Sequence, residues 1–247
     1  MTAELLLLLI LLVKENTAEH CDVQSEESNK RCFVKQTLAT LPHSPNQLAV
    51  DKLTNTLYFS FDAGQGEYLP AALQLDTKRL TVLKGVKDAF AIASDEENGE
   101  VYFGGSHGIY RYNPVLKTLK RLLVKNLDIW WLVLKSDCTL SGSRFVFDAE
   151  DNIFFINGTG LFGIKNNSTS PILLKDNPRF LGMAIDNSSH VHLCSESSIY
   201  VISQMVQKVK KIVSIAGVLG IGFDRDNNLI YSDSHELIRL MPVNSKS

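Results

Sequence analysis

The chain has 247 residues, a formal net charge of -2 at pH 7, and 45% apolar residues that include 12 Phe and 7 Tyr. This length and apolar content suit one large domain with a substantial core. The near-neutral charge argues against nucleic acid as a partner, because binding a phosphate backbone requires a clustered excess of Lys and Arg.

Residues 5–13 form an unbroken apolar run of nine residues. The run is too short to span a bilayer and has the length of a signal-peptide core, although no Lys or Arg precedes it. Small and polar residues follow it, ending at Ala18. We therefore expect a signal peptide at 1–18, a single mature domain at 19–247, and a secreted protein with no membrane association after cleavage. A short anchor and a misassigned start are the alternatives.

Two further features fit secretion. Cys21 and Cys32 are close together just after the expected cleavage site, and in an oxidising compartment we expect them to form a disulfide. Cys138 and Cys194 are isolated, and are either buried thiols or a second pair. Four asparagines stand in glycosylation sequons, of which two are adjacent: Asn157, Asn166, Asn167 and Asn187.

The main feature of the sequence is an internal repeat. Five short segments of apolar or small residues each end in Asp, at 48–51, 92–95, 145–148, 183–186 and 221–224. A polar turn and an apolar strand follow each Asp, and third and fourth strands follow in most units. A four-stranded meander of about forty residues is typical of a β-propeller blade. A β-sandwich is the alternative, but it gives no reason for five matching turns.

The spacing of the repeated Asp residues leaves the number of blades open. Asp51 and Asp95 are 44 residues apart, and the last two intervals are 38 residues each, but Asp95 and Asp148 are 53 apart. We expect an all-β propeller of four-stranded blades, either six-bladed with one blade truncated after 128–132, or five-bladed with an insertion. The last unit lacks a fourth strand, and a strand at 33–41 is expected to supply it and close the ring.

These motifs resemble the ommochrome-binding proteins of insect haemolymph. The resemblance rests on residues 54–60, 104–110, 128–130, 151–155, 159–161 and 226–233. It implies a secreted carrier of ommochromes, which are tryptophan-derived phenoxazinone pigments, on a six-bladed propeller. The chain departs from that pattern after Trp131, where the rest of the third blade is missing.

In a propeller the first strand of each blade lines the axial channel, and ligand pockets open at its mouth. A flat, acidic pigment requires aromatic stacking and a cation or amide donor. Large aromatic residues are also common between blades, so packing is the alternative role for each. The ligand-binding candidates that meet these criteria are Asn46, Gln47, Phe90, Trp130, Trp131 and Arg144.

Two other functions remain alternatives to a carrier. Calcium-dependent lactonases and esterases share the six-bladed architecture, but they gather acidic and amide ligands at the channel mouth, and no such set converges here. We interpret the repeated Asp residues as turn formers, and expect no catalytic residue, no metal and no cofactor. His190 and His192 lie two residues apart and form only a weak metal signal. A protein-interaction propeller is the third possibility.

Overall fold

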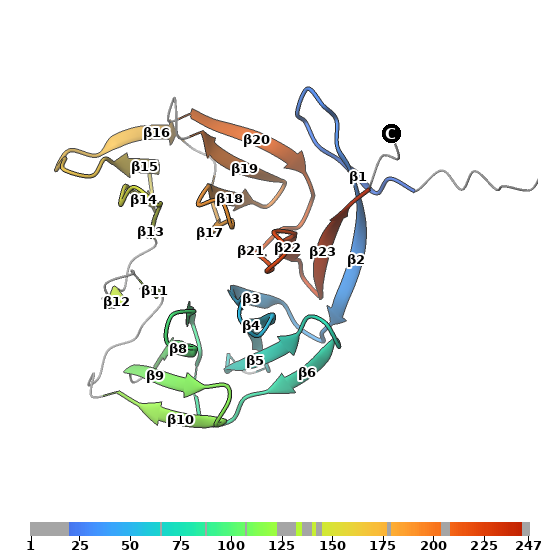
Figure 1. Cartoon of the computed structure of the whole chain (residues 1–247), viewed down its shortest axis with the longest axis vertical. Coiled ribbons are helices and arrows are strands. Elements are labelled where there is room, and N and C mark those ends of the chain that lie inside the picture. The colour runs from blue at the N-terminus through green and yellow to red at the C-terminus, as the bar shows by residue number, and fades with distance from the viewer. Residues whose placement is uncertain are drawn as a thin grey trace, which may run out of the picture.

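The structure of the protein is a computed structural model. It describes residues 20–243 except 65, 87, 107, 123–131, 135–139, 142–144, 177–178 and 204–207. All regular elements in these residues are β-strands, arranged as antiparallel sheets around a central axis (Figure 1). No helix in this part of the chain is long and apolar enough to cross a membrane. The all-β propeller predicted from the sequence is confirmed.

Five sheets form complete blades, numbered here in chain order. Blade 1 contains β3 (Pro45–Asp51), β4 (Thr56–Asp62), β5 (Tyr68–Gln74) and β6 (Arg79–Val82). Blade 2 contains β7 (Ala91–Asp95), β8 (Glu100–Gly105), β9 (Gly108–Asn113) and β10 (Thr118–Arg121). Blade 3 contains β13 (Phe145–Phe147), β14 (Ile153–Asn157), β15 (Gly160–Ile164) and β16 (Ile172–Asp176). Blade 4 contains β17 (Gly182–Ile185), β18 (Val191–Ser195), β19 (Ser198–Ser203) and β20 (Lys208–Ser214).

Blade 5 joins the two ends of the chain. Its order is β21 (Gly220–Phe223), β22 (Leu229–Ser232), β23 (Glu236–Pro242), β2 (Cys32–Thr40) and β1 (Val23–Gln24). A two-stranded sheet of β11 (Val133–Leu134) and β12 (Leu140–Ser141) lies between blades 2 and 3 (Figure 1). The segment 128–131, expected to begin a truncated blade, lies outside the described residues.

Each repeated Asp organises the turn between the first two strands of its blade. The Asp224 carboxylate accepts hydrogen bonds from the N–H groups of Asp226 (3.0 Å) and Asn228 (2.8 Å), and from Asn228 Nδ2 (3.1 Å). Asp148 and Asp186 repeat the pattern of backbone bonds, while Asp51 and Asp95 use Thr54 and Asn98. An Asp side chain that satisfies local N–H groups stabilises a tight turn. The interpretation of these residues as turn formers is confirmed.

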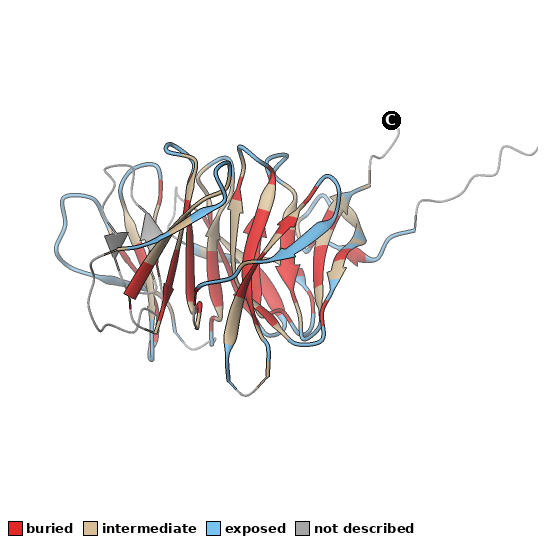
Figure 2. Cartoon of the chain, turned by 90° about the horizontal axis from the view of Figure 1, so that it is seen from below, coloured by how far each residue is buried: buried red, intermediate tan, exposed pale blue. Residues whose placement is uncertain are grey.

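The hydrophobic core lies between the blades and not within any one of them. Tyr58 of blade 1 packs against Phe103 of blade 2 with ring centroids 6.2 Å apart, and Ile199 of blade 4 shares a buried cluster with Ile221 of blade 5. Beyond blade 2, Leu132 packs on Ala91, Ala93 and Ile109. Buried residues therefore run through the middle of the disc, while turns on both faces are exposed (Figure 2). Each blade needs a neighbour to cover its faces.

The N-terminal strand closes the ring. β2 pairs with β23 from Phe33 opposite Pro242 to Thr40 opposite Glu236, which confirms the strand expected at 33–41. A Cys21–Cys32 disulfide, as expected, links the segment before β1 to the start of β2. Cys194 is a free thiol buried between blades 4 and 5, and burial raises its pKa to about 12. Cys138 lies outside the described residues.

A buried ionic contact joins the closing strand to the last Asp turn. Arg239 of β23 donates from Nη1 to Asp224 Oδ2 (3.1 Å), and from Nε and Nη2 to Gln36 Oε1 of β2 (2.9 and 2.6 Å). The Asp224 side chain is fully buried and the Arg239 side chain is 13% exposed. One guanidinium therefore satisfies groups from both ends of the chain.

Replacing Arg239 by Met should lower the free energy of unfolding by about 3–5 kcal/mol, because Asp224 would keep a buried charge without its cation. Arg225, in the same blade, pairs with Asp76 (3.4 Å) with both side chains about half exposed, so Arg225→Met should cost less than about 1 kcal/mol. Urea unfolding of the two variants measures the difference. Equal losses of unfolding free energy in the two variants would show that the buried Arg239–Asp224 pair stabilises the closed ring no more than an exposed pair does.

Candidate functional site: the axial channel

The inner strands of the blades enclose a channel of about 770 Å³. β3, β7, β17 and β21 contribute most of its wall, and Leu132 and Val146 complete it on the side of the two-stranded sheet. The middle of the wall is aliphatic, with Leu48, Val50 and Ile92 among its members. An apolar cavity of this kind favours a ligand with a large apolar surface.

Glycines bring the inner strands of blades 4, 5 and 1 close together. A Cβ on Gly182 would lie 3.2 Å from Cys194 Sγ and 3.7 Å from Gly220 Cα, and one on Gly220 would lie 3.4 Å from Leu48 Cγ. Gly222 in turn faces Val50 at 3.6 Å. These contacts join equivalent positions of neighbouring blades, so the inner strands run in the same direction around the axis. All strand starts therefore lie at one mouth of the channel, and all Asp turns at the other.

The mouth at the strand starts carries aromatic and amide groups. Tyr68, the first residue of β5, and Phe90, just before β7, meet with ring centroids 5.4 Å apart at 60°. Backbone bonds hold the pair in place: the N–H of Ala89 donates to the Tyr68 carbonyl (3.0 Å), and that of Phe90 to the Gly104 carbonyl (2.9 Å). Edge-to-face pairs of this kind present both a ring face and a ring edge to a ligand.

Gln47 and Asn46 provide the amides of this mouth. Asn46 Nδ2 donates to the Ser44 carbonyl (3.2 Å), so part of its hydrogen-bonding capacity is used locally. Gln47 lies in a bulge of β3, between Asn46 opposite Ser60 and Ala49 opposite Tyr58. Its φ of 53° is in the left-handed region, which costs a side chain such as Gln about 1–3 kcal/mol.

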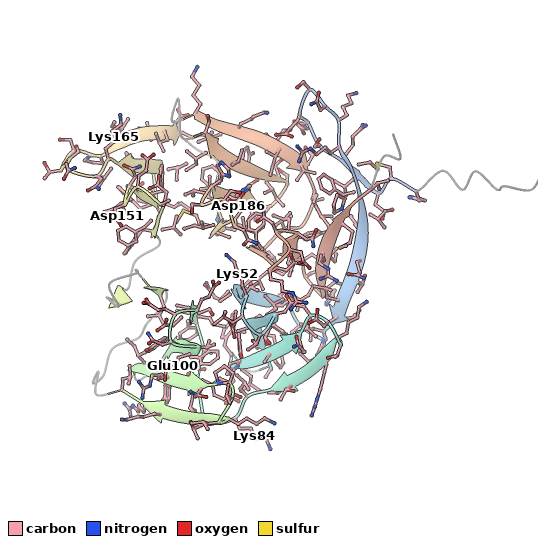
Figure 3. The ribbon with its side chains drawn as sticks, viewed as in Figure 1. Lys52, Lys84, Glu100, Asp151, Lys165 and Asp186 are labelled. Carbon is pink, nitrogen blue, oxygen red and sulfur yellow. A yellow bond between two sulfur atoms is a disulfide. The ribbon has the colours of Figure 1, made fainter. Side chains whose placement is uncertain are left out.

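The opposite mouth, at the Asp turns, is charged. Lys52 reaches from the end of β3 toward the central opening (Figure 3), where its Nζ lies 3.8 Å from Glu96 Oε1. Glu97 also lines this mouth, and the Asp95 carboxylate is held by Asn98 Nδ2 (2.9 Å). Carboxylates outnumber the single described lysine here, so this end is electrostatically unfavourable for an anionic ligand.

A buried histidine supports the wall from behind. The His192 ring packs on Phe223, which lines the channel, with centroids 4.6 Å apart. His192 Nε2 lies 3.2 Å from Asp186 Oδ2, which also contacts His190 Nδ1 at 3.2 Å. Burial lowers the pKa of His192 despite the Asp186 charge. Burial opposes ionisation of Asp186, but hydrogen bonds from the His190 N–H and both imidazole rings outweigh it and lower its pKa. We infer that His192 is neutral and donates from Nε2.

The structure brings three of the six expected ligand-binding residues to one mouth: Asn46, Gln47 and Phe90. Trp130, Trp131 and Arg144 lie outside the described residues. Sequence reasoning missed Tyr68 and Lys52. Tyr68 follows the long loop of the first unit, which had no counterpart in the repeat, and Lys52 follows an Asp whose turn was interpreted as structural. All the candidates remain predictions as ligand contacts.

The described residues contain no group of three His, Cys, Asp or Glu side chains that could hold a metal ion. His190 and His192 instead share Asp186. The sequon asparagines are all exposed: Asn157 ends β14, Asn166 and Asn167 lie in the β15–β16 turn, and Asn187 follows β17. Asn187 Nδ2 donates to the Arg225 carbonyl of the next blade (2.8 Å). Glycosylation at these positions remains a prediction.

No protein-family model matches the chain. The ommochrome-binding protein of Manduca sexta is 26% identical to it over 249 residues, which cover 87% of this chain and 89% of that protein. The chain is a relative of that ommochrome-binding protein. The resemblance predicted from the sequence is therefore confirmed.

Solved structures show the same fold at much lower identity. A candidate gluconolactonase has a TM-score of 0.65 at 10% identity, with 89% of this chain and 97% of that chain covered. The calcium-binding protein regucalcin from Agrobacterium tumefaciens has a TM-score of 0.61 at 11% identity, with coverages of 87% and 96%. At these identities the likeness shows the propeller fold alone.

Because His192 is neutral in the native state, the protein should become less stable at mildly acidic pH. Because the pKa of His192 is lowered in the native state, the unfolded chain binds a proton first as pH falls below about 6.5, and the free energy of unfolding decreases. His192→Gln preserves an N–H donor for Asp186 but does not titrate. The unfolding free energy of the variant should therefore fall less steeply between pH 7 and pH 5 than that of the wild-type protein. The two slopes should differ by up to about 1 kcal/mol per pH unit. Urea unfolding at four pH values measures the slopes, and identical slopes would refute the neutral assignment.

Proposed function

We propose that this protein is a secreted, non-catalytic carrier that binds a small planar aromatic ligand, an ommochrome, in its axial channel. The observation that carries the proposal is the channel itself: an aliphatic cavity with an aromatic pair and amides at one mouth. The relative in Manduca sexta is named for ommochrome binding, which supports the choice of ligand class.

The size and lining of the channel fit such a ligand. Small-molecule sites typically enclose about 300–1,000 Å³ and combine an apolar wall with a few polar groups that set orientation. A volume of about 770 Å³ falls within that range. A fused aromatic ring system gains affinity from the aliphatic wall and from stacking on Phe90 or Tyr68, while amides bond the heteroatoms at its edge.

Extracellular location is part of the same proposal. The apolar run at 5–13 supports a signal peptide, and a disulfide between Cys21 and Cys32 fits an oxidising compartment. The exposure of the sequon asparagines in blades 3 and 4 supports glycosylation.

The decisive experiment is a titration of the purified protein with xanthommatin, followed by calorimetry and by quenching of Trp fluorescence. We expect saturable binding at one site per chain that does not change when calcium is chelated. Absence of saturable binding with several ommochromes would refute the carrier function. Calcium-dependent hydrolysis of a lactone or ester would instead support the enzymatic alternative. If the protein neither binds an ommochrome nor hydrolyses such a substrate, the protein-interaction alternative remains.

Replacing Phe90 by Ala should weaken xanthommatin binding by about tenfold, because one aromatic contact contributes about 0.5–1.5 kcal/mol beyond its buried area. Val115→Ala provides the control, since Val115 is 80% exposed in a turn of blade 2 and does not line the channel. Calorimetric titration compares the two variants. Equal affinities would contradict a ligand position at the aromatic mouth.

A further inference from the structure

Gln47 occupies a backbone position that is unusual in this chain. The other described non-glycine residues with positive φ lie in turns or loops between strands, whereas Gln47 lies within β3. The bulge places Gln47 and Leu48 against the single residue Phe59 of β4. Bulges of this kind commonly use glycine at the left-handed position, because a side chain is strained there. The sequence therefore retains a strained side chain where glycine would fit the backbone better.

Gln47 is the extra residue of the bulge and has no counterpart in blades 2, 4 and 5, whose inner strands pair without a bulge. By strand register, the residues at the level of Asn46 in those blades are Ala91, Gly182 and Gly220, and Arg144 of blade 3 lies outside the described residues. Only at blade 1 does a carboxamide stand at this level of the channel wall, in the part of the ring that the structure describes. A strained residue that is found in one blade only, and that lies beside a cavity, indicates a role in ligand binding and not a requirement of the blade fold.

The Gln47 carboxamide is also available. It makes no hydrogen bond within the described structure, in contrast to Asn46, whose Nδ2 is bound to the Ser44 carbonyl. Gln47 lies at the same mouth as the Tyr68–Phe90 pair, because Tyr68 pairs with Asp62 at the end of β4, next to the start of β3. An amide at the same mouth as two aromatic rings can meet the edge of a flat molecule whose face stacks on a ring.

We propose that Gln47 is the specificity-determining residue of the channel, and that it selects planar ligands whose ring edge carries a carbonyl oxygen. This inference rests on the proposed function. The Nε2 group donates a hydrogen bond to the ligand carbonyl. Because the amide is neutral, binding does not require a charge to be desolvated. Discrimination then arises from the lost hydrogen bond when a ligand lacks the carbonyl.

The test uses two planar tricyclic ligands without a ring N–H, phenoxazin-3-one and phenazine, of which only the first has a ring carbonyl. The wild-type protein should bind phenoxazin-3-one about five- to tenfold more tightly, as expected for one hydrogen bond. Gln47→Gly should remove this preference and leave the melting temperature unchanged or raised, because glycine relieves the strained φ. Gln47→Glu keeps a side chain of the same length but no donor, and should also lose the preference.

Lys117→Gly is the matched control. Lys117 has a φ of 52° in an exposed turn of blade 2, away from the channel, so glycine relieves the same backbone conformation without touching a ligand. It should retain the wild-type preference.

The outcomes separate the inference from the function it depends on. If the wild-type protein binds neither xanthommatin nor phenoxazin-3-one, the proposed function fails and the inference with it. If the wild type binds and Gln47→Gly keeps both affinity and preference, the inference alone is overturned. A loss of preference together with a clear drop in melting temperature, seen in both Gln47 variants, would mark Gln47 as a structural residue and also overturn it.

Discussion

Ring closure is the constraint on which the rest of the structure depends. No blade can bury both of its faces alone, so an open chain of blades would expose two apolar surfaces and two strand edges. β2 covers the edge of β23 by pairing with it, and the Arg239 guanidinium then joins Gln36 of that strand to the buried Asp224 turn. Because Asp224 also shapes the turn at the end of β21, the same contact that closes the ring holds an inner strand against the channel.

The direction of the inner strands gives the two ends of the channel different chemistry. The Asp turns of neighbouring blades bond one another, as in the Asn187 N–H donating to Asn227 Oδ1 (2.8 Å), and Lys52 meets Glu96 across blades 1 and 2. Those bonds link neighbouring blades at the charged mouth. The amide mouth is instead built from the bulge of β3 and the segments that carry Tyr68 and Phe90. The channel therefore has an acidic end and an aromatic end with amide groups, and an anionic ligand is electrostatically disfavoured at the acidic end.

The sequence predicted the fold well because the repeat is local. Each Asp makes its turn-forming bonds within four residues, so the turn is visible as a motif, and the strands follow from alternating apolar residues. The closing strand was also predictable, since the last unit lacked a fourth strand. The site was only partly predictable. Asn46, Gln47 and Phe90 follow from their register with the repeat, but Tyr68 reaches the mouth through a loop without a counterpart, and the left-handed φ of Gln47 leaves no trace in residue type.

The departure of Gln47 from residue preference is itself informative. At the other positive-φ positions Asn, Asp, Ser and Lys occur in turns, where short polar side chains or solvent exposure make the conformation tolerable. None of these reasons applies inside a strand that lines a cavity. Because the inner strands of blades 2, 4 and 5 pair without a bulge, the strained residue is the place where the repeat yields to another requirement. An unpaired amide at the same mouth as an aromatic pair, in an apolar channel, is the chemistry that a flat, carbonyl-bearing ligand would satisfy.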